Sequence, residues 1–205
     1  MARTWRRKDS HLDASKLLRI RHTHALDIEC VFVLRFAHNS HGRMWCGVTK
    51  YEKFLDRIHR EHVRYREEEI AFPVNGLYIR GRRRRPLVVV RESLSSDEKL
   101  CVAAEEMGHH FTSSGNLLYV TPREYERQEW RAKKWAYENL VKLDDLGAAY
   151  TAGYRCLHSM AFRLDVSSEF LEDAILFYRD LYGVEHHTRR YTFQFIPTFS
   201  VSLNQ

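Results

Sequence analysis

The segment SLSSDEKLCVAAEEMGHHFTSSG, residues 93–115, predicts one well-delimited helix and constrains the fold more than any other stretch. Ser95 and Glu98 have the spacing of a capping box at its start, and residues 113–115 supply turn residues at its end. Apolar side chains recur between these signals at helical spacing: Leu100, Ala103, Ala104 and Met107. One side of this helix must therefore be buried, which requires a domain with a core around it.

The same helix carries acidic residues and histidines in the order of a metal site. Glu105 and His109 lie four residues apart and share a face of the helix. In the zinc-protease pattern H-E-x-x-H, the first and last residues bind the metal and the second is the base. With Glu105 and His109 as ligands, Glu106 takes the base position. The other register, Glu106 with His110, would make Met107 the base, and a thioether cannot accept the proton.

A catalytic zinc ion needs a third protein ligand. Thr121-Pro122 predicts the start of a second long helix, in which Glu129 lies 20 residues after His109. That separation allows the chain to turn and cross the first helix. Small residues at 132 and 136 would let the two helices approach closely. Glu126, one turn earlier, is the weaker candidate.

Each of these residues also has a simpler interpretation. An E-E-x-x-H pattern on a charged helix is usually a solvated face, and Glu129 stands in the charged run RQEWRAKKW. His110 fits packing, or a hydrogen bond to a carboxylate behind the metal ligands. Tyr119, Tyr125 and Tyr137 are possible oxyanion donors, but their spacing selects none of them.

The remaining pattern indicates an α+β domain. Residues 51–66 have helical periodicity. Residues 77–79 and 86–90 predict two strands of a two- or three-stranded antiparallel sheet. They are joined by a connection that contains the arginines at 82–85, which we interpret as solvated. A helix is expected at 167–183, and no structure is assigned to the last twenty or so residues.

These elements divide the chain into four parts. Residues 1–43 contain five of the twelve histidines and no sustained periodicity. We interpret them as a disordered arm or as an extension wrongly placed ahead of a natural start near Met44; an ordinary variable N-terminal segment is the alternative. Residues 44–145 form the expected core, 146–184 a helical C-terminal region and 185–205 a tail.

Composition limits the partners and the compartment. The four cysteines are widely spaced, which indicates reduced thiols in a cytoplasmic protein. The longest apolar run, residues 30–37, is too short to cross a membrane and contains an arginine. The net charge of +6 permits nucleic acid as a partner, but AFRLDVSSEF is the nearest approach to a helix-turn-helix. Direct nucleic-acid binding is therefore not expected.

AAEEMGHHFTSSG followed by RQEWRAKKWAYENLV resembles the ImmA/IrrE metallopeptidases, particularly those of prophages and mobile elements of Gram-positive bacteria. YEKFLDRI, NGLYIRG and FLEDAILFYRDLYG resemble flanking segments of that family in the same order. The resemblance covers residues 51–184.

The resemblance implies a small zincin-like domain, with helices around a short sheet and a helical C-terminal extension. It implies a zinc ion with Glu129 as the third ligand and Glu106 as the base. It also implies an endopeptidase that cleaves or inactivates a helix-turn-helix repressor, often after DNA damage, so that a mobile element is derepressed.

Glu105 departs from the better-known members, which have histidine at this position. A site with two glutamates and one histidine is harder and more anionic, and it would accept Mn²⁺ or Fe²⁺ more readily. The alternative to an active peptidase is a catalytically inactive regulator of the same fold that binds its repressor without cleaving it.

Overall fold

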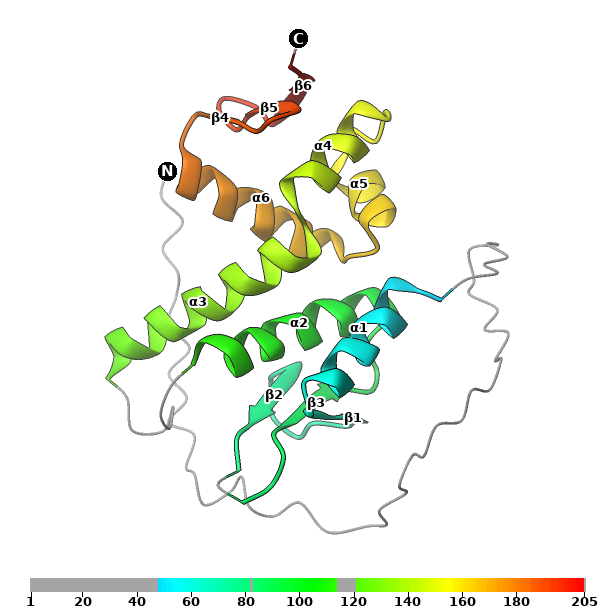
Figure 1. The fold of residues 1–205 in the computed structure, drawn as a ribbon, viewed down its shortest axis with the longest axis vertical. Coiled ribbons are helices and arrows are strands. Elements are labelled where there is room, and N and C mark those ends of the chain that lie inside the picture. The colour runs from blue at the N-terminus through cyan, green and yellow to red at the C-terminus, as the bar shows by residue number, and fades with distance from the viewer. Residues whose placement is uncertain (1–47, 82, 114–120, 205) are drawn as a thin grey trace. The chain divides into compact units, whose positions relative to one another are not determined.

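The computed structural model describes residues 48–81, 83–113 and 121–204, all within one unit, Cys46–Gln205 (Figure 1). The segment 1–43, which the sequence sets apart, lies outside the described residues.

Helix α2, Ser96–Thr112, is the element that the sequence predicts best. The Ser95 hydroxyl accepts a hydrogen bond from the Glu98 amide, and the Glu98 carboxylate accepts one from the Ser95 amide at 2.8 Å. This is the predicted capping box. Leu100, Ala103, Ala104 and Met107 are buried, as the apolar spacing requires.

Helix α3, Pro122–Leu140, begins as predicted at Thr121 and has proline in its first turn. It crosses α2 on the side away from the first sheet (Figure 1). Ala132 and Ala136 are almost fully buried at this crossing. A Cβ added to Gly108 would lie 2.8 Å from the carbonyl carbon of Ala132. The two helices therefore pack backbone against backbone, as the small residues predict.

Helix α1, Lys50–Arg60, is shorter than the predicted helical segment 51–66, so that prediction is wrong after Arg60. The helix ends because His62 adopts a left-handed conformation, with φ of 57°. The His62 amide bonds to the His59 carbonyl, and the Val63 amide to the Ile58 carbonyl. This is a Schellman motif with histidine where glycine is usual.

The chain released by this motif forms β1, Arg64–Glu68, which the sequence does not predict. Strands β2, Gly76–Ile79, and β3, Leu87–Arg91, form the predicted antiparallel pair. Strand β1 adds in parallel to the other edge of β3, which gives the order β1-β3-β2. Helices α1 and α2 pack on this sheet. Strand β2 is an edge strand, and it contacts α2.

The C-terminal region contains helices α4, Leu143–Thr151, α5, Leu157–Leu164, and α6, Ser168–Tyr182. A three-residue turn joins α5 to α6. In it Asp165 has φ of 52°, Val166 is buried, and the Ser167 hydroxyl accepts from the Phe170 amide. The AFRLDVSSEF stretch, the nearest approach to a helix-turn-helix in the sequence, is thus a short turn between two helices.

The segment to which the sequence assigns no structure folds into a second sheet, β4-β5-β6. Its antiparallel strands are Glu185–His187, Tyr191–Gln194 and Ser200–Leu203. Tyr191, Phe193 and Phe195 are buried, and the Tyr191 ring packs against Gly147 of α4. These aromatic side chains hold the sheet on the helical region.

Lys50 joins the first part of the fold to the helical region. Its ammonium group donates to the carbonyls of Leu140 and Leu164, the last residues of α3 and α5, at 2.9 and 2.5 Å.

Together, the described residues form the expected α+β fold, a small zincin-like domain with a helical extension. None of the described helices is long and apolar enough to cross a bilayer.

Candidate active site

The structure brings together His109 of α2 and Glu129 of α3. His109 Nε2 and Glu129 Oε1 lie 3.3 Å apart across the close helix crossing. The imidazole is buried, and its other nitrogen, Nδ1, lies 3.1 Å from the Ser113 hydroxyl. The two predicted donors from separate helices therefore face one another, as their separation in sequence suggests.

Glu106, the predicted base, lies against strand β2 and within electrostatic range of Glu129. A Cβ added to Gly76 would lie 2.7 Å from Glu106 Oε1, so this glycine lets the edge strand approach the carboxylate. Burial raises the pKa of Glu106 to about 8, and the charges of Glu105 and Glu129 act in the same direction. A hydrogen bond from the Tyr78 amide opposes the shift. The carboxyl group therefore lies in a shielded, negatively charged environment.

Glu105 is partly buried one turn before His109. Burial raises its pKa, Lys133 lowers it, and Glu129, Asp173 and Glu169 raise it. Its charged neighbours thus come from α3 and from the first turns of α6. Among residues 48–81, 83–113 and 121–204, no three His, Cys, Asp or Glu side chains meet at metal-binding spacing. The structure therefore joins two of the three predicted ligands and leaves Glu105 beside them.

His110 faces the sheet. Its Nδ1 lies 2.9 Å from the Tyr78 hydroxyl, and its ring packs between those of Tyr78 and Phe111. Burial lowers its pKa. His110 therefore supports β2, the strand whose Tyr78 amide bonds to Glu106. Within the described part of the chain, no hydrogen bond joins His110 to a site carboxylate.

Among the three candidate tyrosines, the structure favours Tyr125. Tyr137 is buried in the core against Phe170 and Phe177, and Tyr119 lies outside the described residues. The Tyr125 side chain is 47% exposed, and its hydroxyl hydrogen-bonds to the Glu129 carboxylate. The weaker ligand candidate, Glu126, is exposed.

Ser113 and Tyr125 are site residues that the helical positions of the predicted ligands could have indicated. Ser113 follows His109 by four residues, and Tyr125 precedes Glu129 by four. Residues four apart share a helix face, so each can reach its ligand. Many serines and tyrosines satisfy that spacing, and only the folded chain shows which ones make the contact.

The chemistry of these donors fits a divalent cation. Zinc bonds to nitrogen and oxygen are about 2.0–2.2 Å, so two ligand atoms of a tetrahedral site lie roughly 3.3 Å apart. The His109–Glu129 separation of 3.3 Å agrees with that spacing. Burial lowers the pKa of His109, although Glu129 opposes the shift, and the neutral imidazole is the form that binds metal. A neutral imidazole nitrogen and a carboxylate face one another favourably only with a proton or a cation between them.

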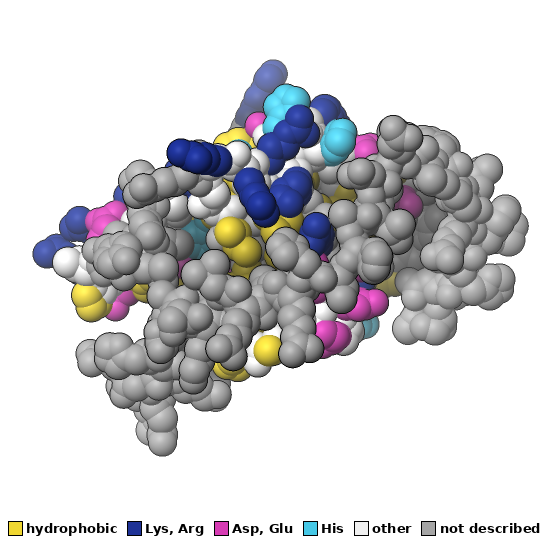
Figure 2. Space-filling model, turned by 90° about the horizontal axis from the view of Figure 1, so that it is seen from below, with side chains coloured by type: hydrophobic (Ala, Val, Ile, Leu, Met, Phe, Trp, Pro, Cys, Tyr) yellow, Lys and Arg dark blue, Asp and Glu magenta, His cyan; other side chains and the backbone are white. Residues whose placement is uncertain are grey.

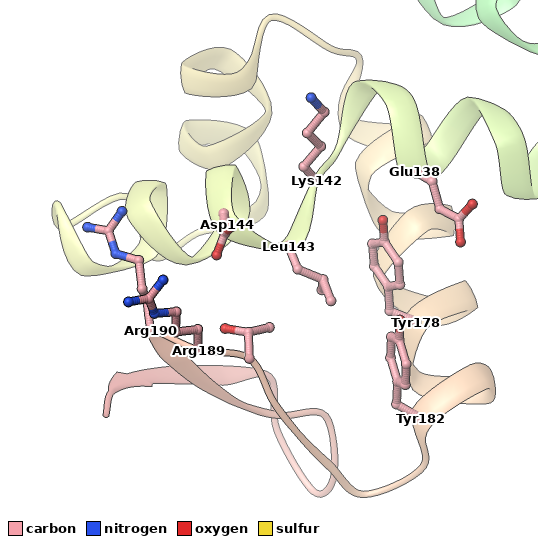
Figure 3. A pocket seen from close by; sticks show the side chains of 9 residues that line it. Glu138, Lys142, Leu143, Asp144, Tyr178, Tyr182, Arg189 and Arg190 are labelled. Carbon is pink, nitrogen blue, oxygen red and sulfur yellow. The ribbon is translucent and has the colours of Figure 1, made fainter. Parts of the chain in front are cut away.

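A cavity of about 480 Å³ lies elsewhere, between the C-terminal end of α3, the start of α4, α6 and the β4–β5 connection (Figure 3). Tyr178 and Tyr182 form one side, and Arg189 and Arg190 come from the connection. It shares no residue with the α2–α3 site. The candidate active site is thus formed at the helix crossing and the neighbouring edge strand.

Residues 51–176 match the model of the IrrE N-terminal-like domain, peptidase family M78. The chain belongs to this family. The matched part of this IrrE N-terminal-like domain runs from α1 into α6 and contains Glu105, Glu106, His109 and Glu129, which confirms the resemblance. It is therefore a metallopeptidase-type domain. No curated protein and no solved structure matches the chain.

Proposed function

We propose that this IrrE N-terminal-like domain is a zinc-dependent endopeptidase that cleaves or inactivates a phage-type helix-turn-helix repressor and so derepresses a mobile element. One observation carries the proposal. The shielded Glu106 carboxyl lies within electrostatic range of Glu129, and the Glu129 carboxylate faces the His109 imidazole of another helix at 3.3 Å. A base next to two metal donors is the arrangement that metal-assisted hydrolysis needs.

His109 and Glu129 would hold the cation, and Glu105 is the proposed third donor. Glu105 suits this role because it lies one helical turn before His109. Its carboxyl group also interacts electrostatically with Glu106 and with Glu129. Zinc is the proposed metal, and the two carboxylates also suit Mn²⁺ or Fe²⁺.

When bound, the cation would supply the Lewis acidity that polarises the scissile carbonyl and makes the attacking water more acidic. Glu106 takes the proton from that water and delivers it to the nitrogen of the leaving amine. To act as a base it must be ionised, and a nearby positive charge lowers the carboxyl pKa that burial has raised.

The charge on α6 argues against contact of this helix with DNA. The exposed side chains of α6, which follows the AFRLDVSSEF turn, include Glu169, Glu172 and Asp180, and these would repel phosphates. Lys and Arg side chains gather instead on the face in Figure 2, which looks from the side of the first sheet. Arg80 and the arginines 83–85 are exposed and lie in the connection from β2 to β3. We propose a cytoplasmic repressor protein as the partner, without direct binding to nucleic acid.

Co-expression with the helix-turn-helix repressor whose gene lies nearest to the gene of this protein tests the proposed function. We expect intact-mass spectrometry to show two repressor fragments whose masses sum to the repressor plus one water. Cleavage should stop when zinc is removed by a chelator and return when Zn²⁺ or Mn²⁺ is added. A repressor that co-purifies with the chain but stays intact under all conditions would favour the inactive regulator. If the repressor is neither cleaved nor bound, both proposed roles are contradicted.

A further inference from the structure

Each of the two facing donors has a hydrogen-bond partner of its own. The His109 ring has Ser113 at Nδ1, and the Glu129 carboxylate has the Tyr125 hydroxyl. Neither partner belongs to the proposed ligand set or to the base. In metal sites such outer partners orient the ligands and raise affinity.

Ser113 is well placed to fix the His109 ring. It is the C-cap of α2, and its own amide donates to the His109 carbonyl at 3.0 Å, which fixes the serine backbone relative to the histidine. Its hydroxyl lies 3.1 Å from Nδ1. If Nδ1 carries the ring proton and donates it to this hydroxyl, Nε2 is left with a lone pair that faces Glu129.

Tyr125 acts on the other donor from the same helix. It lies in the first turns of α3, which Thr121 caps, so its backbone is fixed one turn before Glu129. Glu129 itself is only partly buried, since 33% of its side chain is exposed. A partly exposed carboxylate rotates freely unless something holds it, and a phenol donor restricts that rotation.

We propose that Ser113 and Tyr125 are positioning residues that hold the His109 imidazole and the Glu129 carboxylate in a divalent-cation-binding arrangement. They act on the resting site through the two ligands. Their removal therefore weakens cation binding in the absence of any substrate. The inference rests on the proposed function, because it requires a cation at His109 and Glu129.

The test is the Kd for Zn²⁺ of the full chain, measured by competition with a chromophoric chelator. Ser113→Ala and Tyr125→Phe are each expected to raise the Kd about tenfold to a hundredfold. Ser113→Thr, which keeps the hydroxyl, should bind zinc nearly as well as wild type. Ser200→Ala and Tyr154→Phe are matched controls on β6 and after α4, and should leave the Kd unchanged.

The outcomes separate this inference from the proposed function. Wild-type affinity in both Ser113→Ala and Tyr125→Phe overturns the positioning role and leaves the peptidase intact. A wild-type chain that binds no zinc overturns the positioning role together with the proposed metal site. If Ser113→Ala does not fold, as judged by circular dichroism, Tyr125→Phe decides, since it removes only a hydroxyl group.

Discussion

Glu106→Gln is expected to slow peptide-bond hydrolysis by about 10²–10⁴-fold, the usual contribution of a positioned general base. The amide is nearly the same size as the carboxyl group, so packing against Gly76 and β2 is retained. It cannot take a proton from water. The loss should therefore fall on kcat, measured on the repressor or on a peptide that contains its scissile bond, with bound zinc unchanged.

Glu126→Gln is the matched control, because Glu126 is an exposed carboxylate on α3 close in sequence to Glu129. It should cleave at the wild-type rate. Wild-type turnover in Glu106→Gln would show that another group accepts the proton, and the assignment of the base would then be wrong.

The same substitution has a pH-dependent effect on the stability of the metal-free chain. The pKa of Glu106 is raised from 4.5 to about 8 in the folded state. A raised pKa contributes stability below the unfolded pKa, and that contribution is lost as pH rises through the folded pKa. Glu106→Gln should match wild type at pH 4 and exceed its free energy of unfolding at pH 9 by roughly 2–4 kcal/mol, after allowance for partial exposure. Urea unfolding with a chelator present measures this difference.

Gly108→Ala is expected to destabilise the protein by about 1–3 kcal/mol and to weaken zinc binding. The added Cβ would lie 2.8 and 2.9 Å from the carbonyl carbon and Cα of Ala132, and closer still to its oxygen. Backbone atoms cannot rotate away, so α3 must move, and Glu129 moves with it. Helix propensity alone predicts the opposite sign, a gain of up to about 1 kcal/mol.

Gly81→Ala is the control for this substitution, since the nearest atoms to its added Cβ are 3.5 Å away. It should change the free energy of unfolding little. A Gly108→Ala chain as stable as wild type, with unchanged zinc affinity, would contradict the backbone contact between α2 and α3.

The elements that could be predicted from sequence are those with local signals. The α2 capping box, the Thr121-Pro122 start of α3 and the β2–β3 pair all depend on residues close in the chain. Strand β1 was missed because histidine occupies the left-handed position that ends α1. The α5–α6 turn was hard to recognise for a similar reason, since Asp165 stands where glycine is usual.

The site, like the fold, was predictable where it depends on residues close in sequence and not where it depends on distant ones. Helical spacing allowed two registers, and the inability of Met107 to act as a base favoured the one with Glu106 and His109. The small residues at 132 and 136 indicated how Glu129 would approach. The surroundings of Glu105 depend on Asp173 and Glu169 of α6, more than sixty residues away. No local pattern reports such packing. The strands β4–β6 were missed because they are only three or four residues long and are stabilised by contacts with distant helices.

The metal content of the purified full chain, measured by plasma mass spectrometry, tests the central claim most directly. We predict about one zinc ion, or one Mn or Fe ion, per wild-type chain, with the metal lost in His109→Ala and Glu129→Ala. Loss in Glu105→Ala as well would identify Glu105 as the third ligand. A wild-type chain that contains no metal even after zinc is supplied would contradict the metallopeptidase site at the α2–α3 crossing.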